Sequence, residues 1–131
     1  MNRFYILLTI FLSFSTLAAE DWIKIAETDD TLWEGRAGSR IPATTKSGKE
    51  ISVASGRIFD RKEKRFDFVK WYVSVEDCYN GYGKLVTLNM QGEYRFENDF
   101  VEKGGSVASS LASMLCYPLL EEKREKAGKG I

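Results

Sequence analysis

Cys78 and Cys116 are the only two cysteines in this chain. An even cysteine count in an exported protein predicts a disulfide, and the first residues of the chain indicate export. Closing a loop of this length stabilises a folded domain by about 3–4 kcal/mol, a large share of the net stability of a small domain. A redox pair is not expected, because the chain has no Cys-x-x-Cys motif and no histidine to lower a thiol pKa.

Residues 1–19 have the pattern of a secretory signal peptide. Arg3 supplies the positive charge, the run that follows to Ala19 carries no charge, and cleavage after Ala18 or Ala19 fits the small residues there. As a helix this run would be about 24 Å long, shorter than the roughly 30 Å core of a bilayer. No cysteine lies near the cleavage site to carry a lipid. We therefore expect a periplasmic or secreted protein that has no membrane attachment after cleavage.

The amino-acid composition limits the kinds of partner and catalytic site that this chain can have. With 131 residues, 44% of them hydrophobic, the chain can form one domain with one core. The 19 basic and 19 acidic side chains balance, so the chain lacks the positive field of a nucleic-acid-binding protein. The absence of histidine excludes a Ser-His-Asp or Cys-His triad and a His-ligated metal within this chain. We expect no metal, no cofactor and no nucleic-acid partner.

Hydrophobic patterning predicts about six strands followed by one helix. The expected strands are 22–26, 31–36, 51–59, 66–75, 84–90 and 94–100. Residues 37–49 are rich in Gly, Ser, Thr and Lys, which predicts a loop, and residues 60–65 predict a charged turn. Residues 80–83 predict a further turn. The whole pattern is typical of an α+β fold in which a bent antiparallel sheet packs under a C-terminal helix.

The segment 66–75 carries the clearest strand pattern. One face has Val69, Trp71 and Val73, and the other has Phe66 and Phe68 with more polar neighbours. Such a strand is expected in the centre of the sheet, with its wholly apolar face under a helix. Cys78 follows directly, so a disulfide would link the last helix to the end of this strand.

The strands 84–90 and 94–100 predict a hairpin around Gly92. A three-residue loop of residues 91–93 would pair Met90 with Tyr94 and Leu88 with Phe96, so that the apolar residues share a face.

Ser106 is a good N-cap for the last helix, which we expect to end near Cys116 because Pro118 disfavours helical geometry at the residue before it. The domain would then comprise residues 20–117, and residues 118–131 would form a charged, flexible tail.

Several sequence features, taken together, are similar to those of a known protein family. They are Trp22-Ile23-Lys24-Ile25-Ala26 before an acidic turn, a long strand ending at Cys78, Leu85-Val86-Thr87-Leu88 before the Gly92 turn, Gly105-Ser106-Val107-Ala108 at the start of the last helix, and Cys116. On these features, residues 22–117 resemble the surface-adhesin protein E-like domain of Gram-negative bacteria. The resemblance implies an antiparallel sheet and a C-terminal helix joined by a disulfide between Cys78 and Cys116. It also implies a partner among host extracellular-matrix proteins, and a homodimer.

Two groups of side chains are candidates for partner binding. The basic turn, comprising Arg61, Lys62, Lys64 and Arg65, could dock an acidic partner, although Asp60 and Glu63 lie among these residues and a solvated turn is the simpler interpretation. Tyr79 and Tyr82 flank a glycine-rich turn beside the predicted disulfide and are expected to be exposed.

We therefore expect a non-enzymatic, exported binding domain. The alternative is a periplasmic inhibitor or immunity protein that acts on a secreted hydrolase. A hydrolase that uses two carboxylates is a third hypothesis, and no spacing of acidic residues favours it.

Overall fold

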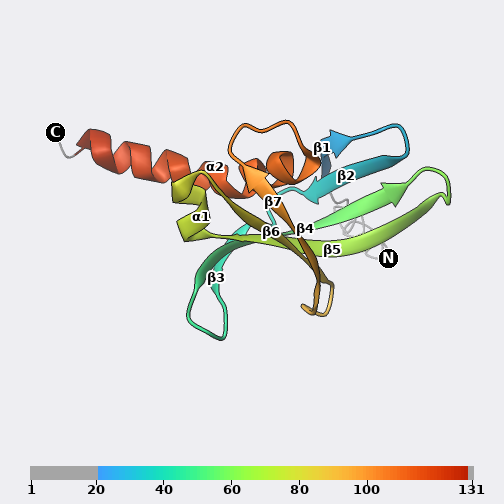
Figure 1. Ribbon diagram of the computed structural model, residues 1–131, viewed down its shortest axis with the longest axis horizontal. Helices are drawn as coiled ribbons and strands as arrows, with labels where there is room; N and C mark the ends of the chain where they lie inside the picture. Colours follow the sequence, from blue (N-terminus) through green and yellow to red (C-terminus); the bar gives the residue numbers. More distant parts are fainter. Residues whose placement is uncertain (1–20, 130–131) are drawn as a thin grey trace, which may run out of the picture.

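The computed structural model describes residues 21–129 (Figure 1). The predicted signal peptide therefore lies outside the described residues. The elements are β1 (Trp22–Glu27), β2 (Thr31–Arg36), β3 (Ile41–Thr44), β4 (Glu50–Asp60), β5 (Arg65–Ser74), α1 (Val75–Asn80), β6 (Tyr82–Asn89), β7 (Tyr94–Val101) and α2 (Val107–Lys129).

The strands form one antiparallel sheet in the order β1-β2-β4-β5-β6-β7, and β3 pairs with the first part of β4. The predicted α+β class is confirmed, with seven strands rather than about six. The additional strand is β3, which lies in the segment predicted to be a loop. It contains Pro42, which an edge strand tolerates because its missing N–H need not join the ladder.

The core lies between the sheet and α2, which crosses one face of it (Figure 1). Val69, Trp71 and Val73 of β5 are all buried on this face, as the alternating pattern predicted. Leu111 and Leu115 of α2 are buried against them. The strand with the clearest pattern is thus central, with its apolar face under the helix.

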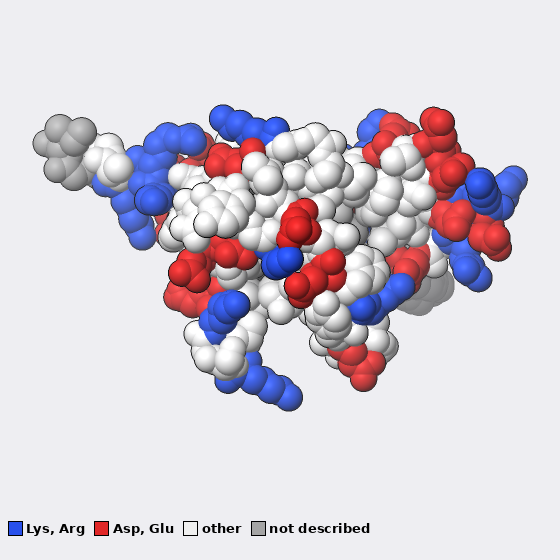
Figure 2. Space-filling view, in the orientation of Figure 1, with Lys and Arg blue, Asp and Glu red and all other residues white. Residues whose placement is uncertain are grey.

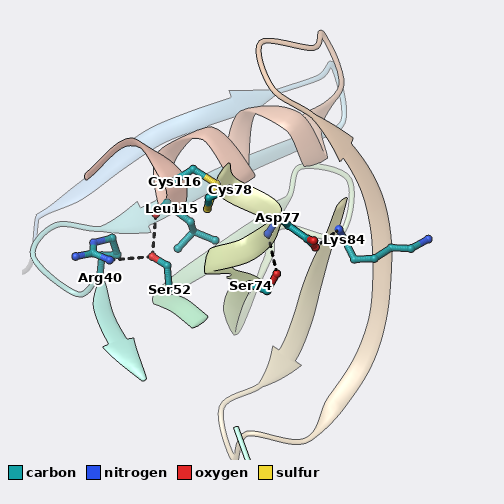
Figure 3. Close-up of a disulfide and its surroundings, with 8 residues drawn as sticks. All are labelled: Arg40, Ser52, Ser74, Asp77, Cys78, Lys84, Leu115 and Cys116. Atoms are coloured by element: carbon teal, nitrogen blue, oxygen red, sulfur yellow. Dashed lines mark hydrogen bonds between the residues drawn. A yellow bond between two sulfur atoms is a disulfide. The ribbon is translucent and has the colours of Figure 1, made fainter. Parts of the chain in front are cut away.

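A short helix, α1, follows β5 where the strand was expected to continue and a turn to follow. Ser74 begins it as the N-cap, and the hydroxyl of Ser74 accepts a hydrogen bond from the Asp77 amide at 3.0 Å (Figure 3). Gly81 ends the helix in the left-handed conformation, with φ of 86°, which suits glycine. The Asp77 carboxylate then accepts a hydrogen bond from the Lys84 amide, which joins α1 to the start of β6.

The disulfide between Cys78 and Cys116 is confirmed (Figure 3). It joins α1 to α2, with the two Cα atoms 5.3 Å apart, and both cysteines are buried. Because α1 follows β5 directly, the bond attaches the C-terminal helix to the end of the central strand.

The prediction that the last helix ends near Cys116 is wrong. Instead, α2 continues through Pro118 to Lys129, so most of the predicted tail is helical. Proline in a helix interior removes one intrahelical hydrogen bond. In the turn before it, the Leu115 carbonyl accepts an additional hydrogen bond at 2.8 Å from the Ser52 hydroxyl of β4, and Leu119 and Leu120 pack against the core. Tertiary contacts therefore support the helix on both sides of the proline.

The predicted register of the last hairpin is also wrong. Leu88 pairs with Tyr94 and Thr87 with Phe96, so that Arg95 has no partner across the ladder. This extra residue is a β-bulge, which shifts the pairing by one position. Leu85 and Thr87 are buried in the core, on the face of β6 that the pairing of Thr87 with Trp71 of β5 sets.

Candidate functional site

The sheet face opposite α2 carries exposed aromatic side chains, and we call it the open face. It is defined by Phe66 and Phe68 of β5, Arg57 and Phe59 of β4, and Trp22 of β1. Phe66 and Phe68 are 43% and 45% exposed, values unusual for large apolar side chains near the centre of a sheet. No described element packs over them.

Arg57 lies at the centre of the open face, between two aromatic rings. Its guanidinium carbon is 4.2 Å from the centre of the Trp22 ring and 4.3 Å from the centre of the Phe66 ring. Its Nε donates to the Glu34 carboxylate at 2.7 Å. Both side chains of this ion pair are mostly buried, at 21% and 15% exposed. Cation–π contacts and the ion pair therefore hold the guanidinium in a defined position.

The strand register explains how these residues meet. Glu34 of β2 pairs with Arg57 of β4, and Arg57 pairs with Phe68 of β5, which places all three in one row across the sheet. Phe59 pairs with Phe66 in the next row, and their ring centres are 4.7 Å apart. Trp22 completes the cluster from the edge strand, with its ring 6.0 Å from that of Phe68 in an edge-to-face contact.

The free edge of the Arg57 guanidinium is suited to recognising an anion. Within residues 21–129, its two Nη groups have no hydrogen-bond partner. A guanidinium binds a carboxylate through two parallel hydrogen bonds, and flanking aromatic rings exclude water from such a pair. Arginine, tryptophan and other aromatic residues are also those that dominate the energy of protein interfaces.

The basic turn lies at the far end of the β4–β5 hairpin and is neutralised by acidic residues. Arg61 forms an ion pair with Glu27 at 2.6 Å, and Lys62 lies 3.6 Å from Asp30. Hydrogen bonds from Lys24 and Arg61 lower the pKa of Glu27 to about 2. Figure 2 shows blue and red side chains intermixed at this end of the molecule. Lys64 lies in this turn and Arg65 begins β5, and both are exposed among side chains of mixed charge rather than in a uniform basic patch.

Tyr79 and Tyr82 lie at the opposite end of β5 from the basic turn (Figure 1). They are 46% and 63% exposed, in agreement with the expected exposure. The Lys123 ammonium of α2 lies 4.6 Å from the centre of the Tyr79 ring. The two predicted groups are thus not brought together, and neither belongs to the open face.

Sequence reasoning placed Phe66 and Phe68 on a common strand face but did not identify Arg57. The relevant signal was the pair of aromatic residues at alternate positions of β5, Phe66 and Phe68, on the face away from Trp71. A single arginine within a strand has no motif, and its aromatic neighbours become visible only when the register is known.

Among residues 21–129, no group of three or more Cys, Asp or Glu side chains is arranged to hold a metal ion. In the same range, no helix combines the length and the apolar character needed to cross a membrane.

Comparison with known proteins finds no family model that matches this chain, no curated protein that is similar to it and no solved structure that resembles it.

Proposed function

We propose that this protein is an exported, non-enzymatic interaction domain that binds a protein partner through the open face. The observation that carries the proposal is the guanidinium of Arg57, held between Trp22 and Phe66 on a sheet face that no described element covers. Export is supported by the signal-peptide pattern of residues 1–19 and by the disulfide, which is typical of oxidising compartments.

The chemistry of the open face specifies the partner's surface. The Nη groups of Arg57, which have no partner within residues 21–129, would pair with an Asp or Glu side chain on the partner. The exposed rings of Phe66 and Phe68 would pack against apolar side chains that lie next to this carboxylate on the partner. An acidic residue flanked by apolar ones on a protein surface satisfies both requirements.

Matrix proteins are the first probes to use, because residues 22–117 resemble the surface-adhesin protein E-like domain. The exported chain, purified with its disulfide intact, should be passed over a panel of immobilised extracellular-matrix proteins at physiological salt. We expect saturable binding to at least one of them.

Two variants test the face itself. Phe68→Ala removes an exposed ring, and Arg57→Gln removes the charge; each should weaken binding at least tenfold. Tyr82→Ala is the matched control, because Tyr82 is also an exposed aromatic residue but lies outside the open face, and the substitution should leave the affinity unchanged. Circular dichroism spectra should confirm that all three variants are folded.

The proposal fails if no matrix protein binds saturably to the folded domain. It also fails if Tyr79→Ala or Tyr82→Ala abolishes binding while Phe68→Ala does not, because recognition would then lie at the α1 end of the sheet.

A further inference from the structure

A second feature lies on the other face of the sheet, where α2 begins. A cavity of about 520 Å³ opens between the sheet and the first turns of this helix. Its walls are mainly apolar, with Trp33 and Ile58 from β2 and β4, Phe96 from β7 and Leu111 from α2. This volume lies within the roughly 300–1,000 Å³ typical of small-molecule sites.

Two buried hydrogen-bond donors without partners line this cavity. Trp71 of β5 and Thr87 of β6 face each other across the ladder, and each is only 1% exposed. Within residues 21–129, neither the Trp71 indole N–H nor the Thr87 hydroxyl has a hydrogen-bond partner. Buried polar groups nearly always form hydrogen bonds. The buried donors of Trp71 and Thr87 therefore require an explanation.

The other buried hydroxyls show how unusual Thr87 is. Ser52 donates to the Leu115 carbonyl at 2.8 Å, and Ser74 accepts from the Asp77 amide at 3.0 Å. Ser109 accepts from the Val101 amide at 3.1 Å. Among the buried hydroxyls of residues 21–129, Thr87 is thus the exception, and it lies in the wall of this cavity.

The start of α2 adds a favourable electrostatic environment. Val107 and Ala108, the first residues of the helix, line the cavity, and the first turn contains no acidic residue. The first amides of a helix have no intrahelical partners, and the helix dipole makes this end positive. Asp99 also lines the cavity, and its carboxylate is ion-paired with Lys84.

We propose that this cavity binds a small amphiphile that ends in a carboxylate. The apolar body of the ligand contacts Trp33, Ile58 and Phe96. Its carboxylate accepts hydrogen bonds from the donors that line the cavity, with Thr87 and Trp71 supplying the two that lack partners. This site is separate from the open face, and either can be absent without the other.

Dodecanoate is a suitable probe, used below its micellar concentration with the full exported chain. Trp33 and Trp71 both line the cavity, so tryptophan fluorescence should change saturably as the ligand binds. Calorimetry should give one site per chain with a micromolar dissociation constant. Dodecanol, which has the same chain without the carboxylate, should bind at least tenfold more weakly.

Two variants test the residues. Thr87→Val keeps the side-chain shape and removes the hydroxyl, so it should weaken dodecanoate binding about tenfold and raise the denaturation midpoint of the ligand-free protein. Ala108→Phe fills the cavity from α2 and should abolish binding. Phe68→Ala, on the open face, is the control and should leave the affinity for dodecanoate unchanged.

Three results would overturn the proposal. One is the absence of any saturable signal with dodecanoate in the folded protein. Another is equal affinity for dodecanol, which would remove the role of the carboxylate. The third is binding that neither Thr87→Val nor Ala108→Phe reduces, which would place the ligand elsewhere.

Discussion

The indole ring of Trp71 lies against Gly56 on the neighbouring strand, in the space that a side chain at position 56 would occupy. A Cβ atom added to Gly56 would be 2.0 Å from Cζ3 of Trp71 and 2.7 Å from the Glu34 carbonyl oxygen. Both distances are below 3.0 Å, a separation that real Cβ atoms essentially never show. The absence of a side chain at this position in β4 therefore makes room for the indole of Trp71, the largest fully buried side chain among residues 21–129.

Gly56→Ala should consequently destabilise the domain by about 2–3 kcal/mol, because neither the ring nor the strand backbone can move away cheaply. Urea unfolding measures the change. Gly105→Ala is the control, since nothing lies within 4 Å of a Cβ at that position, and it should change the stability by less than about 0.5 kcal/mol. Equal effects of the two substitutions would contradict the packing described for Trp71.

Replacing both cysteines, as in C78S/C116S, should lower the free energy of unfolding by about 3–4 kcal/mol under non-reducing conditions. The bond restricts the unfolded chain and joins α1 to α2 in the folded one. Wild-type protein in reductant provides the control, and its denaturation midpoint should match that of the variant. A variant as stable as the oxidised wild type would show that the bond is absent or does not contribute.

Ser52→Ala tests the link between β4 and the proline-containing helix. The Ser52 hydroxyl donates to the Leu115 carbonyl at 2.8 Å and accepts from the Arg40 guanidinium at 2.9 Å (Figure 3). Losing both bonds at a fully buried site should reduce stability by about 1–3 kcal/mol. Ser113→Ala, at an exposed position of α2, should have little effect when measured in the same way. If Ser52→Ala changes the free energy of unfolding as little as Ser113→Ala does, then other contacts support the helix at Pro118.

The low pKa of Glu27, about 2, predicts a specific pH dependence. Its folded pKa lies below the ordinary value of 4.5, so its contribution to stability is present above pH 4.5 and is lost as the pH falls toward 2. Urea midpoints of the wild type and Glu27→Gln should therefore differ at pH 5.5 and converge near pH 2. Because the ion pairs are exposed, 1 M NaCl should reduce the difference at pH 5.5. A difference that stays constant over this pH range would exclude the Glu27 carboxylate as its source.

The sequence alone predicted the features that depend on a clear pattern within one segment or on residue counts. The two faces of β5 follow from strict alternation around Trp71, and the pairing of Cys78 with Cys116 follows from there being no other cysteine. The α1 helix was missed although Ser74 and Asp77 have the spacing of a helix N-terminus. The extension of α2 beyond Pro118 was missed because the hydrogen bond from Ser52 comes from a residue far away in the sequence.

The candidate site was harder to predict because it depends on pairing between strands. The residues of the open face come from three strands, with Glu34 on a fourth, and a bulge near Ile25 shifts the register of β1. Arg57 has no sequence signal of its own, and it becomes notable only between Trp22 and Phe66. Thr87 lies on the core face because it pairs with Trp71 of β5, and the alternation of apolar residues in β6 alone did not indicate this.

In the folded domain, α2 covers one face of the sheet, and Phe66 and Phe68 are exposed on the other. Hydroxyl-radical footprinting of the monomeric, oxidised domain can check this arrangement, because it measures the solvent access of individual rings. Phe66 and Phe68 should be oxidised at rates comparable to that of exposed Tyr82, while Trp71 stays protected. Protection of Phe66 and Phe68 to the same degree as Trp71 would show that this face of the sheet is covered.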